Sequence, residues 1–127
     1  VVFAKQDVAI GLVGIGDGVA AGAGDVLDHA ALGAALDGID TVVSSIGMDR
    51  GSDFPWARIR VPTDIHSKTT AFLTESMTDR GIGRFVLVSA HGVGDSWSQV
   101  SFPVRALISS SSIGVAYADL GRAEQVL

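Results

Sequence analysis

Two short runs of apolar, mostly β-branched residues constrain the fold of this chain more than any other feature. They cover residues 41–46 (TVVSSI) and residues 84–89 (RFVLVS), and a glycine-containing turn precedes each of them. The apolar residues are continuous rather than alternating, which is typical of strands buried on both faces of a parallel sheet. The sequence therefore predicts two buried parallel strands.

The segment between these runs predicts an amphipathic helix over residues 63–80. Side chains suited to a core recur there at helical spacing and form one stripe: Ile65, Thr69, Phe72, Leu73 and Met77. Thr63 or Asp64 is suited to cap the start of the helix, and Gly81 to end it. Strand, helix and strand in this order predict a right-handed crossover between parallel strands.

The rest of the chain continues the alternation. Strands are expected at residues 1–5 and 19–23, with helices at 29–36, 102–109 and 117–127, a loop at 92–101 and a polar break at 109–112. Asp28 is a good N-cap for the helix at 29–36, and Gly38 is suited to end it. The pattern predicts a single doubly wound α/β domain over residues 1–127.

Composition excludes several classes of function. The 127 residues carry a net charge of −5, and their nine basic residues are scattered, which argues against a nucleic-acid partner. No cysteine is present, and the three histidines lack metal-ligand spacing, so no metal site is expected. No apolar run is long enough to span a membrane, and no signal peptide opens the chain. The expected location is cytoplasmic.

Both ends of the chain suggest a piece of something longer. The sequence opens on Val1 without an initiator methionine, and it stops at Leu127 within an expected helix.

The glycine-rich stretch at residues 11–18 permits two interpretations. Residues 8–10 are suited to a strand, and a strand before closely spaced glycines is typical of a dinucleotide-binding turn. That turn needs a helix after it to receive the pyrophosphate, and residues 19–24 are too few and too glycine-rich to supply one. A flexible linker is the other interpretation.

Several blocks resemble the atypical short-chain dehydrogenase/reductases, more narrowly the NAD(P)H-binding group with NmrA-like proteins and biliverdin-IXβ (flavin) reductase. The blocks are residues 24–28 (GDVLD), 35–43 (ALDGIDTVV), 83–89 (GRFVLVS), 92–96 (GVGDS) and 116–119 with 124–127. The resemblance implies a Rossmann-like doubly wound parallel sheet that is incomplete here, with the first strand and the C-terminal strands missing. Residues 1–5 would be its second strand, left with an unpaired inner edge.

The resemblance also implies a cofactor site for NADP, or for NAD. Lys5 would pair with the 2′-phosphate of NADP. Asp25 and Val26 would line the adenine pocket, with the aspartate accepting from the exocyclic amine. A second group of cofactor-binding positions follows the later strands: Ser45, Ile46, Gly47, Ser89 and Ala90. For Lys5 the alternative is a solvated side chain, and for Asp25 a turn residue.

Two residues are candidates for catalysis. Ser89 would face the nicotinamide and hydrogen-bond the substrate through its hydroxyl, the alternative being a strand-terminal serine that caps local backbone. Tyr117 is the only tyrosine, but Gly121 stands where the wider family has a lysine, so the Tyr–Lys mechanism is not supported. His91 is a further possible proton donor or a plain loop histidine. Trp56 and Trp97 either shape a substrate pocket or pack in loops.

Three functions remain open from the sequence. The first is an NADPH-dependent reductase acting on a small carbonyl, quinone or flavin-type substrate in the intact protein. The second is a non-catalytic NmrA-like nucleotide sensor that binds a partner protein, and the third is an inactive remnant. A homo-oligomer or a completing chain is a further expected partner.

Overall fold

The computed structural model describes residues 2–5, 8–11 and 21–22 by their backbone, and residues 25–127 in full. The described strands are β1 Val2–Lys5, β2 Val8–Gly11, β3 Ala21–Gly22, β4 Thr41–Ser44 and β5 Arg84–Leu87. The described helices are α1 His29–Ala34, α2 Ile65–Asp79, the 3₁₀ helix η1 Gly94–Gln99, α3 Phe102–Ser110 and α4 Ser112–Glu124.

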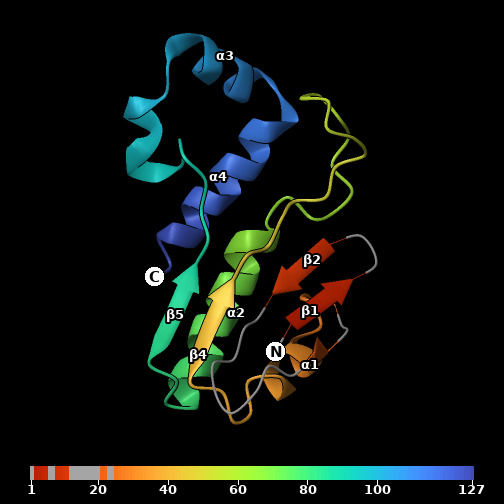
Figure 1. Ribbon diagram of the computed structural model, residues 1–127, viewed down its shortest axis with the longest axis vertical. Coiled ribbons are helices and arrows are strands. Elements are labelled where there is room, and N and C mark those ends of the chain that lie inside the picture. The colour runs from red at the N-terminus through yellow and green to blue at the C-terminus, as the bar shows by residue number, and fades with distance from the viewer. Residues whose placement is uncertain (1, 6–7, 12–20, 23–24) are drawn as a thin grey trace.

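The predicted strand–helix–strand unit is present. β4 and β5 pair in parallel, with Thr41 opposite Arg84 and Ser44 opposite Leu87, and α2 connects them. Figure 1 shows the two strands side by side with α2 behind them. Because the strands are parallel, their carboxyl ends lie at the same edge of the sheet, where ligands of α/β folds bind.

The ends of α2 differ from the prediction in one respect. Gly81 follows the helix with a φ of 68°, the left-handed conformation that glycine adopts without strain, as predicted. Asp64 occupies the N-cap position, but its carboxylate makes no cap hydrogen bond and instead pairs with Lys68 at 2.7 Å. The capping carboxylate comes from α4, as described below.

The N-terminal strands correct the predicted sheet. β1 pairs in parallel with β3, as expected for neighbouring strands of this fold. On its other side β1 pairs antiparallel with β2, so the inner edge that was predicted to be unpaired is occupied. Only two residues separate these strands in sequence, which permits a hairpin but not a parallel crossover. The described strands thus form two sheets, β2-β1-β3 and β4-β5, and β2 also contacts β4.

The core lies between β4 and β5 on one side and α1 and α2 on the other. Its buried members are Val26, Leu32, Leu36, Val42, Ile46, Ile65, Leu73, Met77 and Ile82. The predicted stripe of α2 faces this core, since Ile65, Leu73 and Met77 are buried. The glycine-rich residues 12–20 lie outside the described part of the chain.

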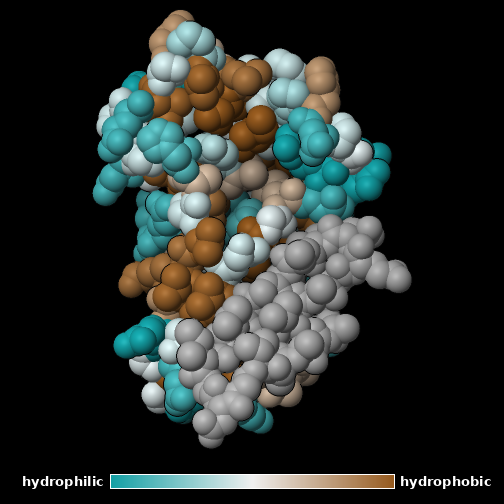
Figure 2. Space-filling view, viewed as in Figure 1, coloured by the Kyte–Doolittle hydropathy of each residue, from teal (hydrophilic) through white to brown (hydrophobic). Residues whose placement is uncertain are grey.

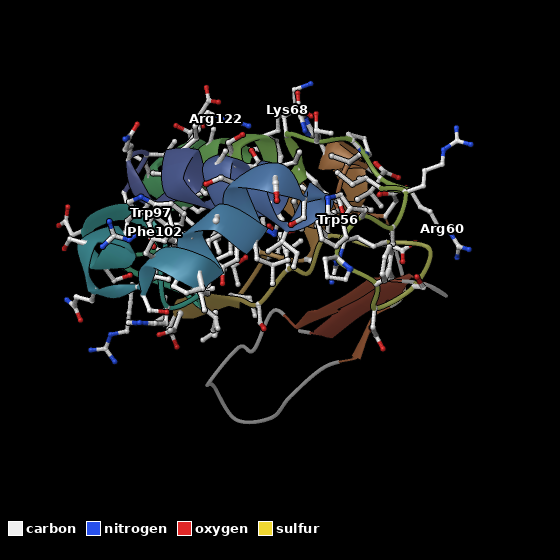
Figure 3. The ribbon with its side chains drawn as sticks, turned by 90° about the horizontal axis from the view of Figure 1, so that it is seen from above. Trp56, Arg60, Lys68, Trp97, Phe102 and Arg122 are labelled. Atoms are coloured by element: carbon white, nitrogen blue, oxygen red, sulfur yellow. The ribbon has the colours of Figure 1, made fainter. Side chains whose placement is uncertain are left out.

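Three of the four β4 residues are buried and Val43 is half-buried, close to the predicted burial on both faces, whereas the prediction is wrong for β5. Along β5, half-buried and exposed residues alternate, and Val86 and Val88 are 44% and 49% exposed. Figure 2 shows apolar surface gathered in this region. Among the described residues, α2 and α4 both lie on the other side of the strands (Figure 3), so nothing described covers this face of β5.

The C-terminal part is more helical than predicted. The expected loop at 92–101 contains η1, and α4 begins at Ser112, five residues before the predicted start at 117. The break between α3 and α4 falls at Ser111, within the predicted polar stretch. The early start of α4 places Ala116 on the same helix as Tyr117, beside α2.

Candidate functional site

A small pocket of about 220 Å³ lies beyond the carboxyl ends of β4 and β5. Its wall consists of Met48, Arg50, His66, Ala90, Ile113, Ala116, Tyr117 and Leu120. Met48 and Ala90 follow β4 and β5, His66 comes from the first turn of α2, and Tyr117 comes from α4. The pocket therefore collects side chains from distant parts of the sequence at the edge where this fold binds ligands.

His66 borders this pocket and is paired with Asp119, which is buried behind it. The His66 side chain is 4% exposed and that of Asp119 is 0% exposed. Nδ1 of His66 lies 3.0 Å from Oδ2 of Asp119, and Nε2 lies 3.1 Å from the carbonyl oxygen of Ile46. One imidazole ring thus joins α2, α4 and the segment that follows β4.

Asp119 also caps α2 from outside that helix. Its carboxylate accepts the backbone N–H of His66 at 2.7 Å and the hydroxyl of Ser67 at 2.5 Å. Arg122 donates to the same carboxylate at 3.1 Å. Burial acts to raise the pKa of Asp119, but the hydrogen bonds from Ser67 and His66 and the charge of His66 outweigh it, so the pKa lies below its usual value. The site therefore holds a buried carboxylate in its charged form.

Sequence reasoning missed the pair, although a signal for it exists. His66 lies on the buried face of α2 with Thr70, Leu73 and Met77, where a histidine needs a polar partner. Asp119 precedes the buried Leu120 on α4, an equally unfavourable place for an unpaired carboxylate. Two polar residues on buried helix faces indicate that they meet each other.

The predicted residues after β4 and β5 lie at or near this pocket. The side chain of Ile46 is buried in the core, while its carbonyl accepts from His66. Ser45 and Gly47 are exposed on either side of it. Ala90 contributes directly to the pocket wall.

The two candidate catalytic residues, Ser89 and Tyr117, form hydrogen bonds with different partners. The Ser89 hydroxyl donates to Oε1 of Glu124 on α4, and Ser89 is exposed. The Tyr117 hydroxyl donates to the carbonyl of His91 at 3.2 Å, while the ring borders the pocket. Gly121 follows Tyr117 by one helical turn, so α4 offers no lysine beside the phenol.

The remaining predicted cofactor residues lie at the other sheet. Lys5 is the last residue of β1, and Asp25 follows the end of the parallel neighbour β3. Oδ1 of Asp25 accepts the backbone N–H of Leu27 at 3.0 Å, a turn contact within the approach to α1. Val26 is 2% exposed and belongs to the core.

A larger cleft of about 800 Å³ lies on the far side of Tyr117. Trp97, Arg122, Gly92, Gly94 and Gly121 are among its lining residues, so Tyr117 separates this cleft from the small pocket. The loop at 49–60 contacts the α3–α4 junction, where Trp56 Nε1 donates to the carbonyl of Ser110 at 2.7 Å. Figure 3 shows Trp56 beside that junction.

The resemblance implies a nicotinamide cofactor, and two features of the strand ends bear on it. A Cβ built on Gly47 would meet no atom within 4 Å, so the backbone after β4 is open to a ligand. The adjoining pocket combines apolar walls with a few polar groups, as ligand sites do. The open backbone at Gly47 and the adjoining pocket therefore leave room for part of a nicotinamide cofactor.

No described helix is long and apolar enough to cross a membrane. The described histidine and acidic residues form no group of three that is able to hold a metal ion.

Comparison with known proteins supports one family. Residues 11–127 match the sequence model of a family described as NAD(P)H-binding. No curated protein and no solved structure matches the chain significantly. The matched range covers most of the chain and all of the elements around the pocket, from β4 to α4. The chain belongs to the NAD(P)H-binding family, and its mixed α/β architecture with parallel strands is consistent with a Rossmann-like nucleotide-binding fold.

Proposed function

We propose that the chain is the NAD(P)H-binding domain of an atypical short-chain dehydrogenase/reductase. In the intact protein it reduces a small carbonyl, quinone or flavin-type substrate with NADPH. The observation that supports the proposal is the pocket beyond β4 and β5, because His66, Tyr117 and the open Gly47 backbone lie at the strand ends, the edge where Rossmann-like folds bind ligands.

The cofactor supplies the hydride when bound, and the chain's own residues bind and orient it. Met48 and Ala90 would contact the nicotinamide end from the two strand ends. Ser89 would hydrogen-bond the substrate, which requires its hydroxyl to leave Glu124. At the other sheet, Lys5 would pair with the 2′-phosphate and Asp25 would accept from the adenine amine.

A non-catalytic nucleotide sensor is the second candidate, and one observation favours it. The Tyr117 hydroxyl is engaged by the His91 carbonyl, and Gly121 leaves no cation to activate that phenol. A sensor needs the cofactor site but no proton donor for a substrate. Binding of NADPH without turnover would therefore favour this candidate.

A titration followed by turnover assays tests the proposal. NADPH and NADH are added to the folded chain, and nicotinamide fluorescence and the emission of Trp56 and Trp97 are recorded. We expect saturable binding, tighter for NADPH, and oxidation of NADPH in the presence of a quinone, flavin or carbonyl acceptor. Absence of binding to a folded sample would contradict both candidates. Binding of NADPH without its oxidation by any acceptor would contradict the reductase and support the nucleotide sensor.

A further inference from the structure

The His66 ring faces a hydrogen-bond acceptor on each side. Asp119 Oδ2 lies 3.0 Å from Nδ1, and the Ile46 carbonyl lies 3.1 Å from Nε2. A neutral imidazole carries one N–H and is able to donate to only one of these acceptors, whereas an imidazolium donates to both. The geometry therefore favours a charged ring, with the buried carboxylate of Asp119 as its counter-ion.

The other charged groups at this site are two arginines, whose positive charge acts against a charged ring, so the imidazolium depends on Asp119 as its counter-ion. Arg122 on α4 contacts Oδ1 of Asp119, the oxygen that does not face the ring. Arg50, from the segment after β4, borders the same pocket. Among the described groups that contact the pair or border its pocket, Asp119 is the acidic one, and the lowered pKa of its carboxyl keeps the negative charge beside the ring.

The contact with Ile46 connects the pair to the cofactor site. The carbonyl oxygen of Ile46 belongs to the peptide that joins it to Gly47, and Met48 next in sequence borders the pocket. No Cβ restrains the Gly47 backbone, so the direction of this peptide depends on an outside contact. The His66 Nε2–H supplies that contact from the first turn of α2.

We propose that His66 is a positioning residue for the nicotinamide end of the cofactor: held by Asp119, its doubly protonated ring orients the Ile46–Gly47 peptide. This inference rests on the proposed function. His66 does not act as a proton donor to the substrate, because both of its nitrogens are engaged by protein acceptors. Its role is to fix the backbone that the nicotinamide contacts.

Comparing the binding of two ligands distinguishes a positioning role of His66 from a general effect on the stability of the fold. NADPH contains the nicotinamide ring, whereas 2′,5′-ADP contains only the adenosine side of the cofactor. We expect His66→Phe and His66→Gln to weaken NADPH binding about tenfold, the effect of losing roughly one buried hydrogen bond, and to leave 2′,5′-ADP binding within about twofold. The matched control is His29→Gln, since His29 is exposed on α1 and stacks on Phe72.

Three outcomes overturn the proposal. Equal weakening of both ligands would indicate a merely structural role, and an unchanged NADPH affinity in folded variants would remove the role entirely. The third outcome comes from the unsubstituted chain without ligand, in which ¹⁵N NMR at neutral pH is expected to show a proton on both ring nitrogens of His66. A single ring proton there would contradict the proposed orientation. If the unsubstituted chain binds neither ligand, the proposed function fails, and the NMR measurement still decides the state of the ring.

Discussion

The Asp119 carboxylate forms hydrogen bonds or ion pairs with three residues beside the pocket, His66, Ser67 and Arg122. It caps α2, pairs with His66, accepts from Ser67 and contacts Arg122. A carboxylate removed from water is unfavourable unless such partners compensate for the lost hydration. The free energy of unfolding of the chain therefore depends on Asp119 remaining ionised.

Measurement of the free energy of unfolding at several pH values tests whether Asp119 must be ionised. The pKa of Asp119 is lowered in the folded chain, so its ionised form contributes stability that is fully present above the ordinary value of 3.8. That contribution is lost as the pH falls through the lower, folded-state pKa. Urea unfolding between pH 7 and 3 should show Asp119→Asn about 2 kcal/mol less stable at pH 7, with a smaller difference at pH 3.

Asp79→Asn is the matched control, because Asp79 ends α2 at an exposed position. It should change the free energy of unfolding by less than about 0.5 kcal/mol at either pH. An Asp119→Asn variant as stable as this control at neutral pH would contradict the assigned role.

At the scale of elements, β4 and β5 differ in what covers them. Val42 on β4 is 1% exposed against α2, whereas Val86 on β5 is 44% exposed on the opposite face. The alternating exposure of β5 was not predicted, because a continuous apolar run does not show which face a neighbour will cover. Burial of a face is decided by the elements packed on it.

Paired substitutions test the one-sided burial of β5. Val42→Ala should lower the free energy of unfolding by about 2–3 kcal/mol, since it opens a cavity in the core. Val86→Ala should lower it by less than about 1 kcal/mol, because much of that side chain already contacts water. Chemical denaturation of the two variants provides the comparison, and equal losses would mean that an unseen partner covers β5.

The turn after β5 packs closely against Val100 and Tyr117. Gly92 has a φ of 92°, and a Cβ there would lie 2.7 Å from Val100 Cγ2 and 3.3 Å from Tyr117 Cε1. We expect Gly92→Ala to cost about 2 kcal/mol, from backbone strain and this overlap. Gly83→Ala, where a Cβ would meet no atom within 4 Å, should cost less than about 1 kcal/mol. Thermal unfolding of both variants checks the difference, and similar melting temperatures would refute it.

For the whole molecule, the proposed cofactor predicts a linkage between binding and stability. A ligand that binds only the folded chain stabilises it by about 2.7 kcal/mol at a concentration one hundred times its Kd. NADPH at that excess should raise the melting temperature measured by circular dichroism, and ATP at the same concentration should not. An NADPH-independent melting temperature would count against cofactor binding.

Much of the architecture was predictable because it depends on local pattern. The apolar runs at 41–46 and 84–89, the stripe of α2 and the glycine at 81 carry their own signals of strand, helix and turn. Asp28, whose carboxylate accepts from Ala30 and Ala31, is likewise the N-cap that its position predicts. The sequence blocks also predicted an NAD(P)H-binding domain, and the family match over residues 11–127 agrees with that coarser prediction.

The sequence by itself determined the strand–helix–strand unit, the parallel pairing of β4 and β5, and the group of positions at their carboxyl ends. Only the tertiary structure decided that β2 pairs with β1, that one face of β5 stays exposed, and that Asp119 rather than Asp64 caps α2. The physical reason is distance along the chain. Periodicity and turn chemistry act between near neighbours, whereas the partner of a buried charge is whichever group the packing of separate helices brings beside it.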